Sequence, residues 1–151
     1  MISTNEARYL VDTNVLLRLV APLPGEDFGK DLRGQLGLDS QLCIAQQSLF
    51  EFWTVVTRPV EVNGMAQSST HAFEMVSLLR RAFQVLPDPE DLLDRWLNIC
   101  KLYSILGKPA HDARLVAVAE ANGISQLVTL NGGHFQRFEN MHIIEPKFLV
   151  R

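Results

Sequence analysis

The sequence predicts an α/β fold, specifically a three-layer α/β/α sandwich with a mostly parallel central sheet. Short apolar runs typical of buried strands alternate with longer segments in which apolar residues recur at helical spacing. Strands that alternate with helices are joined by right-handed crossovers, which place helices on both faces of a parallel sheet. The 151 residues, of which 47% are hydrophobic, contain no internal repeat or linker, so we expect a single domain over residues 1–151.

Six elements are expected in the N-terminal half of the chain. Pro22 and Pro59 follow two of the helices and end them, because proline lacks the backbone N–H that continues a helix. Residues 68–70, Ser-Ser-Thr, supply the N-cap of a further helix. The expected strands are 8–11 and 42–45, and the expected helices are 14–20, 27–36, 47–57 and 69–83.

Five elements are expected in the C-terminal half. Pro109 opens a helix and Gly123 closes it, as proline and glycine commonly do. The expected strands are 84–86, 126–129 and 141–144, and the expected helices are 89–102 and 109–122. Helical spacing groups apolar residues on one face of two helices: Ala72, Phe73, Val76, Leu79 and Phe83 on one, and Leu92, Leu93, Trp96, Leu97 and Cys100 on the other.

Composition narrows the class of protein. A formal net charge of -3 gives no strong attraction for nucleic acid, which argues against a simple nucleic-acid-binding module but not against an enzyme with an acidic pocket. Cys43 and Cys100 lie among apolar residues without a CxxC pair, so we expect buried thiols in a reducing compartment. Neither a signal peptide nor a spanning apolar stretch is evident. We therefore expect a cytoplasmic protein without membrane association.

An acid stands at the point where the first strand meets the first helix. In "YLVDTN", Asp12 follows the apolar residues 9–11 directly. Aspartate is a favoured helix N-cap, which explains its position without any chemistry. The carboxyl end of a parallel strand is also where open α/β sheets place their active sites. Both explanations are open for Asp12 taken alone.

A second acid, Glu51, lies in the helix that follows the second strand. A helical projection places Leu49, Phe52, Trp53 and Val56 on one buried face and Glu51 on a polar stripe with Gln47, Thr54 and Arg58. That stripe is either a solvated face or part of a site. Because Phe50 and Val55 flank it, the helix is apolar most of the way round, which favours a site.

Asp112 is the acid that most strongly indicates a function. It lies in the first turn of its helix, and its neighbours at i+3, i+4 and i+7 are the apolar Leu115, Val116 and Ala119. A first-turn acid also complements the helix dipole, but that role needs only an exposed face. A carboxylate on the core-facing side needs a partner such as a metal ion or an arginine.

Polar residues after the fourth strand are expected at the same edge of the sheet. Asn131 belongs to an Asn-Gly turn signal, so a turn is the favoured explanation for it. Thr129 could offer its hydroxyl toward the edge. Of the four histidines, only His134 lies in this loop, and none has the spacing of a zinc site.

Several enzyme classes lack their signature. There is no GxGxxG, GxxxxGK[ST] or GxSxG segment, so dinucleotide, P-loop and serine-hydrolase functions are not indicated. A phosphotransferase of the haloacid dehalogenase type needs a second aspartate where this chain has Asn14. A two-component receiver domain needs an acid pair after the first strand and a late lysine, and neither is evident.

Three segments together resemble the PIN-domain family of metal-dependent ribonucleases, whose small prokaryotic members are often VapC-like toxins of toxin–antitoxin pairs. They are "YLVDTNVLLRL", "AQQSLFEFWTVVTRP" and "GKPAHDARLVAVAEANGISQLVTLNGGHF", and they cover essentially the whole chain in the family's order. The resemblance implies catalytic, metal-binding acids at Asp12, Glu51 and Asp112. It implies support from Thr13 or Asn14 and from Thr129.

The chain departs from the family at its fourth acid, which usually precedes the phenylalanine after the fourth strand. Here His134 precedes Phe135, and the next carboxylate is Glu139. We therefore expect a three-acid site with Asn131 or His134 as a neutral fourth member. Oxygen ligands suit Mg²⁺ or Mn²⁺. The candidate phosphate-binding cations are Arg18, Arg58, Lys108 and Arg114.

The expected function is hydrolysis of RNA phosphodiester bonds by a cytoplasmic, metal-dependent endoribonuclease, the toxin of a toxin–antitoxin pair. Its partners would be an RNA substrate, a small antitoxin protein and, as a homodimer, a second copy of the chain. The amphipathic helices 69–83 and 89–102 could supply the dimer surface. The alternative is a degenerate PIN domain that binds RNA or protein without cutting.

Overall fold

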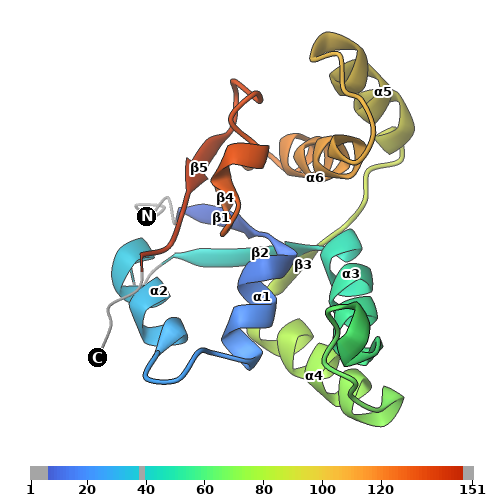
Figure 1. The fold of residues 1–151 in the computed structure, drawn as a ribbon. Helices are drawn as coiled ribbons and strands as arrows, with labels where there is room; N and C mark the ends of the chain where they lie inside the picture. Colours follow the sequence, from blue (N-terminus) through green and yellow to red (C-terminus); the bar gives the residue numbers. More distant parts are fainter. Residues whose placement is uncertain (1–6, 38–39, 148–151) are drawn as a thin grey trace.

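The computed structural model describes residues 7–37 and 40–147 and shows five parallel strands in that part of the chain. The strand order in the sheet is β3-β2-β1-β4-β5 (Figure 1). The bounds are β1 Arg8–Val11, β2 Gln41–Ala45, β3 Gln84–Leu86, β4 Gln126–Val128 and β5 His142–Ile144. In the register of the central strand, Leu10 pairs with Cys43 of β2 and with Leu127 of β4.

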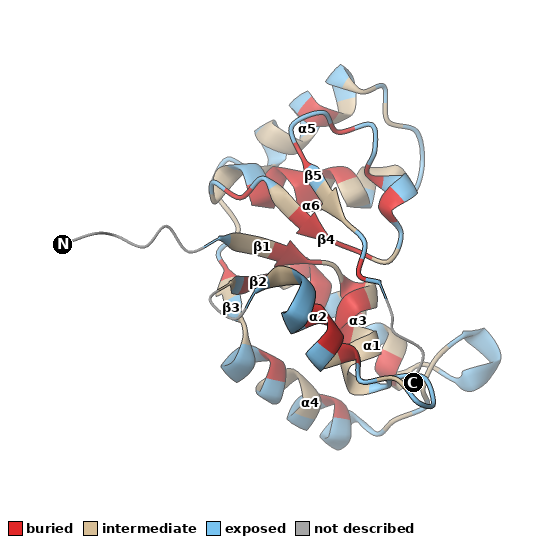
Figure 2. Cartoon of the chain, turned by 90° about the vertical axis from the view of Figure 1, so that its left-hand side faces the viewer, coloured by how far each residue is buried: buried red, intermediate tan, exposed pale blue. Residues whose placement is uncertain are grey.

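Helices cover both faces of this sheet, which confirms the predicted three-layer α/β/α architecture. One layer holds α1 Thr13–Val20, α2 Phe28–Leu36, α3 Gln46–Thr57 and α4 Ser69–Ala82 (Figures 1 and 2). The other layer holds α5 Leu92–Leu102 and α6 Pro109–Ala121. Two short 3₁₀ helices complete the described elements, η1 at Val60–Val62 and η2 at Gly132–His134.

Each face of the sheet has its own apolar core. Successive side chains of a strand point to opposite faces, so Leu10 packs in the core beneath α5 and α6 while Val11 packs in the core beneath α1 to α4. Both side chains are fully buried. A strand covered on both sides has no polar face, which is why β1 reads as a continuous apolar run.

The strand order creates a switch point between β1 and β4. From β1 the chain crosses to β2 on one side, whereas from β4 it crosses to β5 on the other. The connections therefore diverge above the carboxyl ends of β1 and β4, where open α/β sheets bind their ligands. The backbone N–H of Asp12 donates to the carbonyl of Val128 at 2.9 Å, so the two strand ends are held together at this point.

Most predicted boundaries are confirmed to within a few residues, because their signals are local. The Ser68 hydroxyl accepts the His71 N–H at 3.1 Å and caps α4. Pro109 begins α6, and Gly123 follows it in the left-handed region at φ 69°, a conformation that favours glycine. The helix predicted from residue 89 begins only at Leu92, after a turn.

The apolar faces that helical spacing predicts are only partly covered, and Trp53, which was predicted on a buried face, is exposed. Trp53 of α3 is 37% exposed, Phe73 of α4 is 67% exposed, and Leu93 and Leu97 of α5 are at least half exposed. Phe50 is also exposed, so α3 is not buried as far round as predicted. Helical spacing shows which residues share a face, but not how much of that face a neighbouring element covers. On the apolar face of α4, Ala72 and Leu79 are buried.

The two cysteines differ in environment. Cys43 of β2 is buried, whereas Cys100 of α5 is only partly buried, and both are free thiols. The prediction of buried thiols therefore holds for Cys43 and only in part for Cys100. Within the described ranges, no helix is both long and apolar enough to cross a membrane.

Candidate active site

The three acids predicted from the sequence line one pocket of about 490 Å³ at the switch point. Asp12 comes from the end of β1, Glu51 from the second turn of α3, and Asp112 from the first turn of α6. The fold thus unites residues that are up to 100 positions apart in the chain. The remaining lining residues are Thr13, Asn14, Leu17, Phe50, Thr54, Val55, Arg58, Asn131 and His134.

The Asp12 carboxylate is held at both oxygens. Its Oδ1 accepts the Thr13 N–H at 2.8 Å, and its Oδ2 accepts the Thr129 hydroxyl at 2.8 Å. The Thr129 oxygen itself accepts N–H groups from Asn131 at 3.1 Å and from the Asn14 side chain at 3.3 Å. Because both of its acceptor positions are used, its single proton is directed at Asp12. Asp12 is therefore both the N-cap of α1 and a fixed wall of the pocket.

Asn14 holds the end of β4 in place. Its amide nitrogen donates to Thr129, and its carbonyl oxygen accepts the Leu130 N–H at 3.1 Å. The fully buried Thr129 is thereby fixed between α1 and the loop that carries Asn131. The predicted supporting residues, Asn14, Thr129 and Asn131, thus form one network around Asp12.

Glu51 is fixed from two sides. Its Oε2 accepts the Thr13 hydroxyl at 2.6 Å, and its Oε1 accepts the Gln47 amide N–H at 3.2 Å. Both carboxylate oxygens of this half-buried residue are therefore already hydrogen-bonded. Thr13 therefore positions two acids at once, Asp12 through its backbone N–H and Glu51 through its hydroxyl.

Gln47 links α3 to the start of α6. Its amide nitrogen also donates to the His111 carbonyl at 2.9 Å, while its amide oxygen accepts from Arg114 Nη1 at 2.9 Å. Arg114 Nη2 in turn binds Asp88 at 3.0 Å. An arginine can only donate, so Arg114 determines which end of the Gln47 amide faces Glu51. The sequence placed Gln47 on the polar stripe with Glu51 but gave no sign of this link.

The site disfavours several negative charges at once. Burial is the main cause that raises the pKa of Asp12, and the Glu51 charge adds to it, while hydrogen bonds from Thr129 and Thr13 oppose it. Burial, followed by the charge of Asp12, raises the pKa of Asp112, and His134 opposes this shift. The acids are therefore close enough to repel each other, and a bound cation would relieve that repulsion.

The donor chemistry fits a hard divalent cation, since the acids offer only oxygen ligands. Asp112 lines the pocket and accepts no hydrogen bond from any described residue, so its carboxylate is available to an ion. However, no group of three His, Cys, Asp or Glu side chains within residues 7–37 and 40–147 converges closely enough to form a ready ligand set. Of the three acids, Asp112 is the one without a hydrogen bond to a described residue, whereas each carboxylate oxygen of Asp12 and of Glu51 accepts one and is thereby held in place.

Two side chains that are not carboxylates occupy the region where the family usually has a fourth acid. Asn131 and His134 both line the pocket, and His134 is near enough to act on the pKa of Asp12 and Asp112. An acid that the sequence analysis missed, Glu145, directly follows β5 and accepts the Gly132 N–H at 2.6 Å. It thereby holds η2, which carries His134. Its position after a strand end was the signal that could have found it.

The four candidate phosphate-binding cations differ in their surroundings. Arg18 binds Glu26 through two hydrogen bonds of 2.8 and 2.9 Å, and Arg114 is engaged by Gln47 and Asp88. Lys108 is exposed just before α6. Of these four, Arg58 alone lines the pocket with the acids.

The raised pKa values of Asp12 and Asp112 predict how the stability of the metal-free protein changes with pH. A folded-state pKa above the ordinary 3.8 means that the folded protein binds these protons more tightly than the unfolded chain. The resulting stabilisation is complete when the pH is below the ordinary value of the unfolded chain, and it is lost as the pH rises through the raised pKa of the folded protein. Asp112→Asn has no such proton to lose. Between about pH 4 and pH 7, the free energy of unfolding of this variant should therefore rise relative to that of the parent.

Urea unfolding of both proteins in EDTA across this range measures the difference, in which titrating groups that do not interact with Asp112 cancel. A difference that stays constant with pH would mean that Asp112 titrates normally.

The chain belongs to the PIN domain family. The family model matches residues 9–140, which is most of the sequence. Among curated proteins, none matches the sequence significantly.

Solved structures with the same fold come from toxin–antitoxin systems. VapBC2 from Rickettsia felis, bound to a DNA fragment from its promoter, has a TM-score of 0.70 at 15% identity and covers 91% of this chain and 98% of its own. DNA-bound VapBC from Salmonella typhimurium has a TM-score of 0.70 at 18% identity, with 93% and 99% covered. Mycobacterium tuberculosis VapC20, a sarcin-ricin loop cleaving toxin, has a TM-score of 0.56 at 20% identity, with 79% and 86% covered. At these identities the likeness is one of fold.

Proposed function

We propose that this protein is a metal-dependent endoribonuclease, the toxin of a toxin–antitoxin pair, and that it hydrolyses RNA phosphodiester bonds. The observation that carries the proposal is the pair of carboxylates, Asp12 and Asp112, which line one pocket at the switch point and lie close enough for the charge of Asp12 to raise the pKa of Asp112. Membership of the PIN domain family and the fold shared with an RNA-cleaving toxin support it.

Each residue of the pocket has a role in this proposal. Asp12 and Asp112 would hold Mg²⁺ or Mn²⁺, and when bound the ion would polarise a phosphate oxygen and lower the pKa of an attacking water. Thr129 keeps the Asp12 carboxylate in one orientation through its directed proton. Glu51, whose position Thr13 and Gln47 fix, orients the attacking water or completes the ligand shell. His134 lies beside the two aspartates, where the family usually has a fourth acid.

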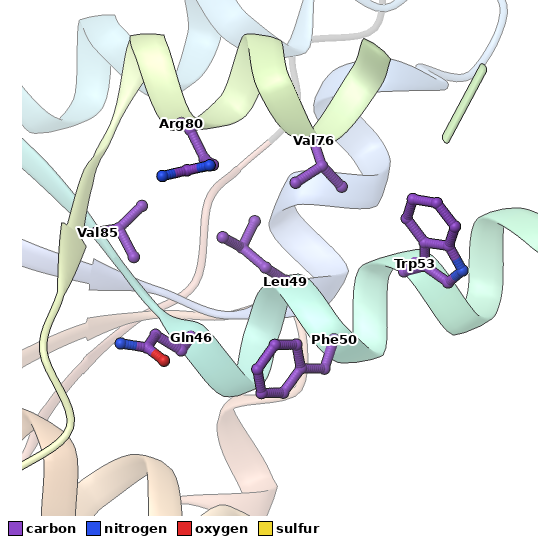
Figure 3. Close-up of a pocket in the computed structure, with 7 residues that line it drawn as sticks. All are labelled: Gln46, Leu49, Phe50, Trp53, Val76, Arg80 and Val85. Carbon is purple, nitrogen blue, oxygen red and sulfur yellow. The ribbon is translucent and has the colours of Figure 1, made fainter. Parts of the chain in front are cut away.

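An antitoxin partner is part of the proposal, because several solved structures with this fold are toxin–antitoxin complexes. A groove of about 590 Å³ between α3 and α4 would accept an apolar antitoxin segment (Figure 3). Phe50 lines both this groove and the acidic pocket, so a segment seated in the groove would end beside the acids. The other lining residues are Gln46, Leu49, Trp53, Val76, Arg80 and Val85.

A homodimer through α4 and α5 remains a prediction. Phe73 and Leu78 of α4 and Leu93, Leu97 and Leu102 of α5 are exposed apolar side chains, which a second copy of the chain could cover.

The proposal is tested with purified protein, single-stranded and structured RNAs, and Mg²⁺, Mn²⁺ or EDTA. Cleavage should require the metal and should be lost in Asp112→Asn, which should also bind Mn²⁺ more weakly by calorimetry. Asp94→Asn is the matched control, because Asp94 is an exposed first-turn acid of α5 and has the same helix-dipole interaction without the pocket. RNA binding without cleavage, together with no metal binding, would favour the alternative of a non-catalytic binding module.

A further inference from the structure

Arg58 is a cation of the acidic pocket that has no acidic partner. It ends α3 and lines the pocket together with Asp12, Glu51 and Asp112. No carboxylate of the described residues lies within ion-pair distance of it. Its Nη2 donates to the Asn63 carbonyl at 3.1 Å, while its buried Nε has no acceptor among the described atoms. A guanidinium that the protein itself leaves uncompensated can bind an anion from outside.

The loop after α3 fixes the place of this arginine. Residues 59–67 fold back on the helix end, and the Ala66 N–H donates to the Arg58 carbonyl at 3.0 Å. Asn63, whose carbonyl binds the guanidinium, adopts a left-handed conformation at φ 61°. A Cβ at Gly64 would lie 1.9 Å from the Arg58 carbonyl oxygen, so only glycine fits this close approach. The arginine is thus held by its own loop rather than by the acids.

The spacing along α3 separates Arg58 from the reacting centre. Glu51 and Arg58 are seven residues apart, which places them on the same side of the helix and about 10 Å apart along its axis. This separation of the two backbone positions favours a phosphate for Arg58 other than the one at Asp12 and Asp112. An arginine fork matches the two free oxygens of a backbone phosphate.

We propose that Arg58 binds a backbone phosphate adjacent to the scissile one on the same RNA strand. The inference rests on the proposed function, and it makes an oligonucleotide rather than a single phosphodiester the ligand of the pocket. The acids and their metal ion would bind the scissile phosphate, and Arg58 would position the RNA strand by binding the neighbouring phosphate.

Binding tests the inference without any cleavage. In an Asp12→Asn background, a labelled single-stranded oligoribonucleotide is titrated between about 50 and 200 mM salt. Arg58→Met should weaken binding about tenfold at low salt and make the slope of log affinity against log salt shallower by about 0.7, the value for one phosphate contact on a single strand. Arg58→Lys should restore most of the slope. Arg81→Met removes an exposed arginine of α4 outside the pocket and should change neither quantity.

Cleavage gives a second readout that separates a phosphate contact from a structural role. For an oligoribonucleotide, Arg58→Met should raise KM about tenfold and leave kcat unchanged. For bis(p-nitrophenyl) phosphate, which has a single phosphate, it should change neither constant. An equal loss on both substrates, or an unchanged salt slope, would overturn the inference. If the parent cleaves nothing, the proposed function fails while the binding titration still decides the role of Arg58.

Discussion

Replacing Asp12 by asparagine should reduce RNA cleavage by about a thousandfold or more, the scale of losing a group that acts in the chemical step. Asparagine keeps the shape and the N-cap, since it caps helices as well as aspartate does. It removes the negative charge that would bind the metal. The asparagine would also place its amide NH₂ opposite the Thr129 hydroxyl. That hydroxyl already accepts hydrogen bonds from Asn14 and Asn131, so it needs an acceptor for its own proton and would lose it. Single-turnover cleavage of an oligoribonucleotide with Mn²⁺ measures the loss.

A control separates this effect from helix capping. Asp27 caps α2 through the Lys30 N–H, so Asp27→Asn makes the same exchange at another N-cap and should leave cleavage unchanged. The melting temperature of Asp12→Asn should stay close to that of the parent, because loss of a disfavoured charge offsets loss of the Thr129 hydrogen bond. Full activity of Asp12→Asn would show that this acid is a cap and nothing more.

Replacing Gln47 by leucine should lower both stability and activity. The buried Gln47 amide makes three hydrogen bonds that leucine cannot replace. The substitution therefore leaves the His111 carbonyl and an Arg114 donor without their partner. We expect the free energy of unfolding to fall by about 2 to 4 kcal/mol. Because Glu51 loses one of its two anchors, cleavage should fall by about 10- to 100-fold even well below the melting temperature.

The matched control is Gln46→Leu, which makes the same exchange one residue earlier, in the wall of the apolar groove. It should change activity little. Gln47→Glu provides a second comparison, because its carboxylate still accepts from Arg114 but repels Glu51. It should therefore impair activity more than stability. If Gln47→Leu unfolds at lower urea concentration yet cleaves at the parent rate, the link between α3 and α6 supports the fold without positioning Glu51.

The sequence predicted the architecture well because the relevant signals are local. Alternation of apolar runs with helical periodicity fixed the order of strands and helices, and residues such as Ser68, Pro109 and Gly123 marked helix ends through their own backbone chemistry. The acids were also found from local signals, because Asp12 and Glu51 stand at or just after the end of a strand, and Asp112 lies in a first helical turn with apolar neighbours at i+3, i+4 and i+7. The predicted burial of Trp53 was wrong, because burial depends on what lies opposite a face.

What the sequence determined by itself is therefore the PIN-type arrangement of elements and the acids at its carboxyl edge. Only the tertiary structure decided how those acids are held. The Thr129 proton directed at Asp12, the Gln47 amide oriented by Arg114, and the unpaired Arg58 fixed by its own loop all depend on contacts between atoms. Hydrogen-bond polarity and charge pairing arise from three-dimensional neighbours, and most of these neighbours come from separate segments of the chain. A pattern along one segment carries no information about which donor or charge another segment brings to it.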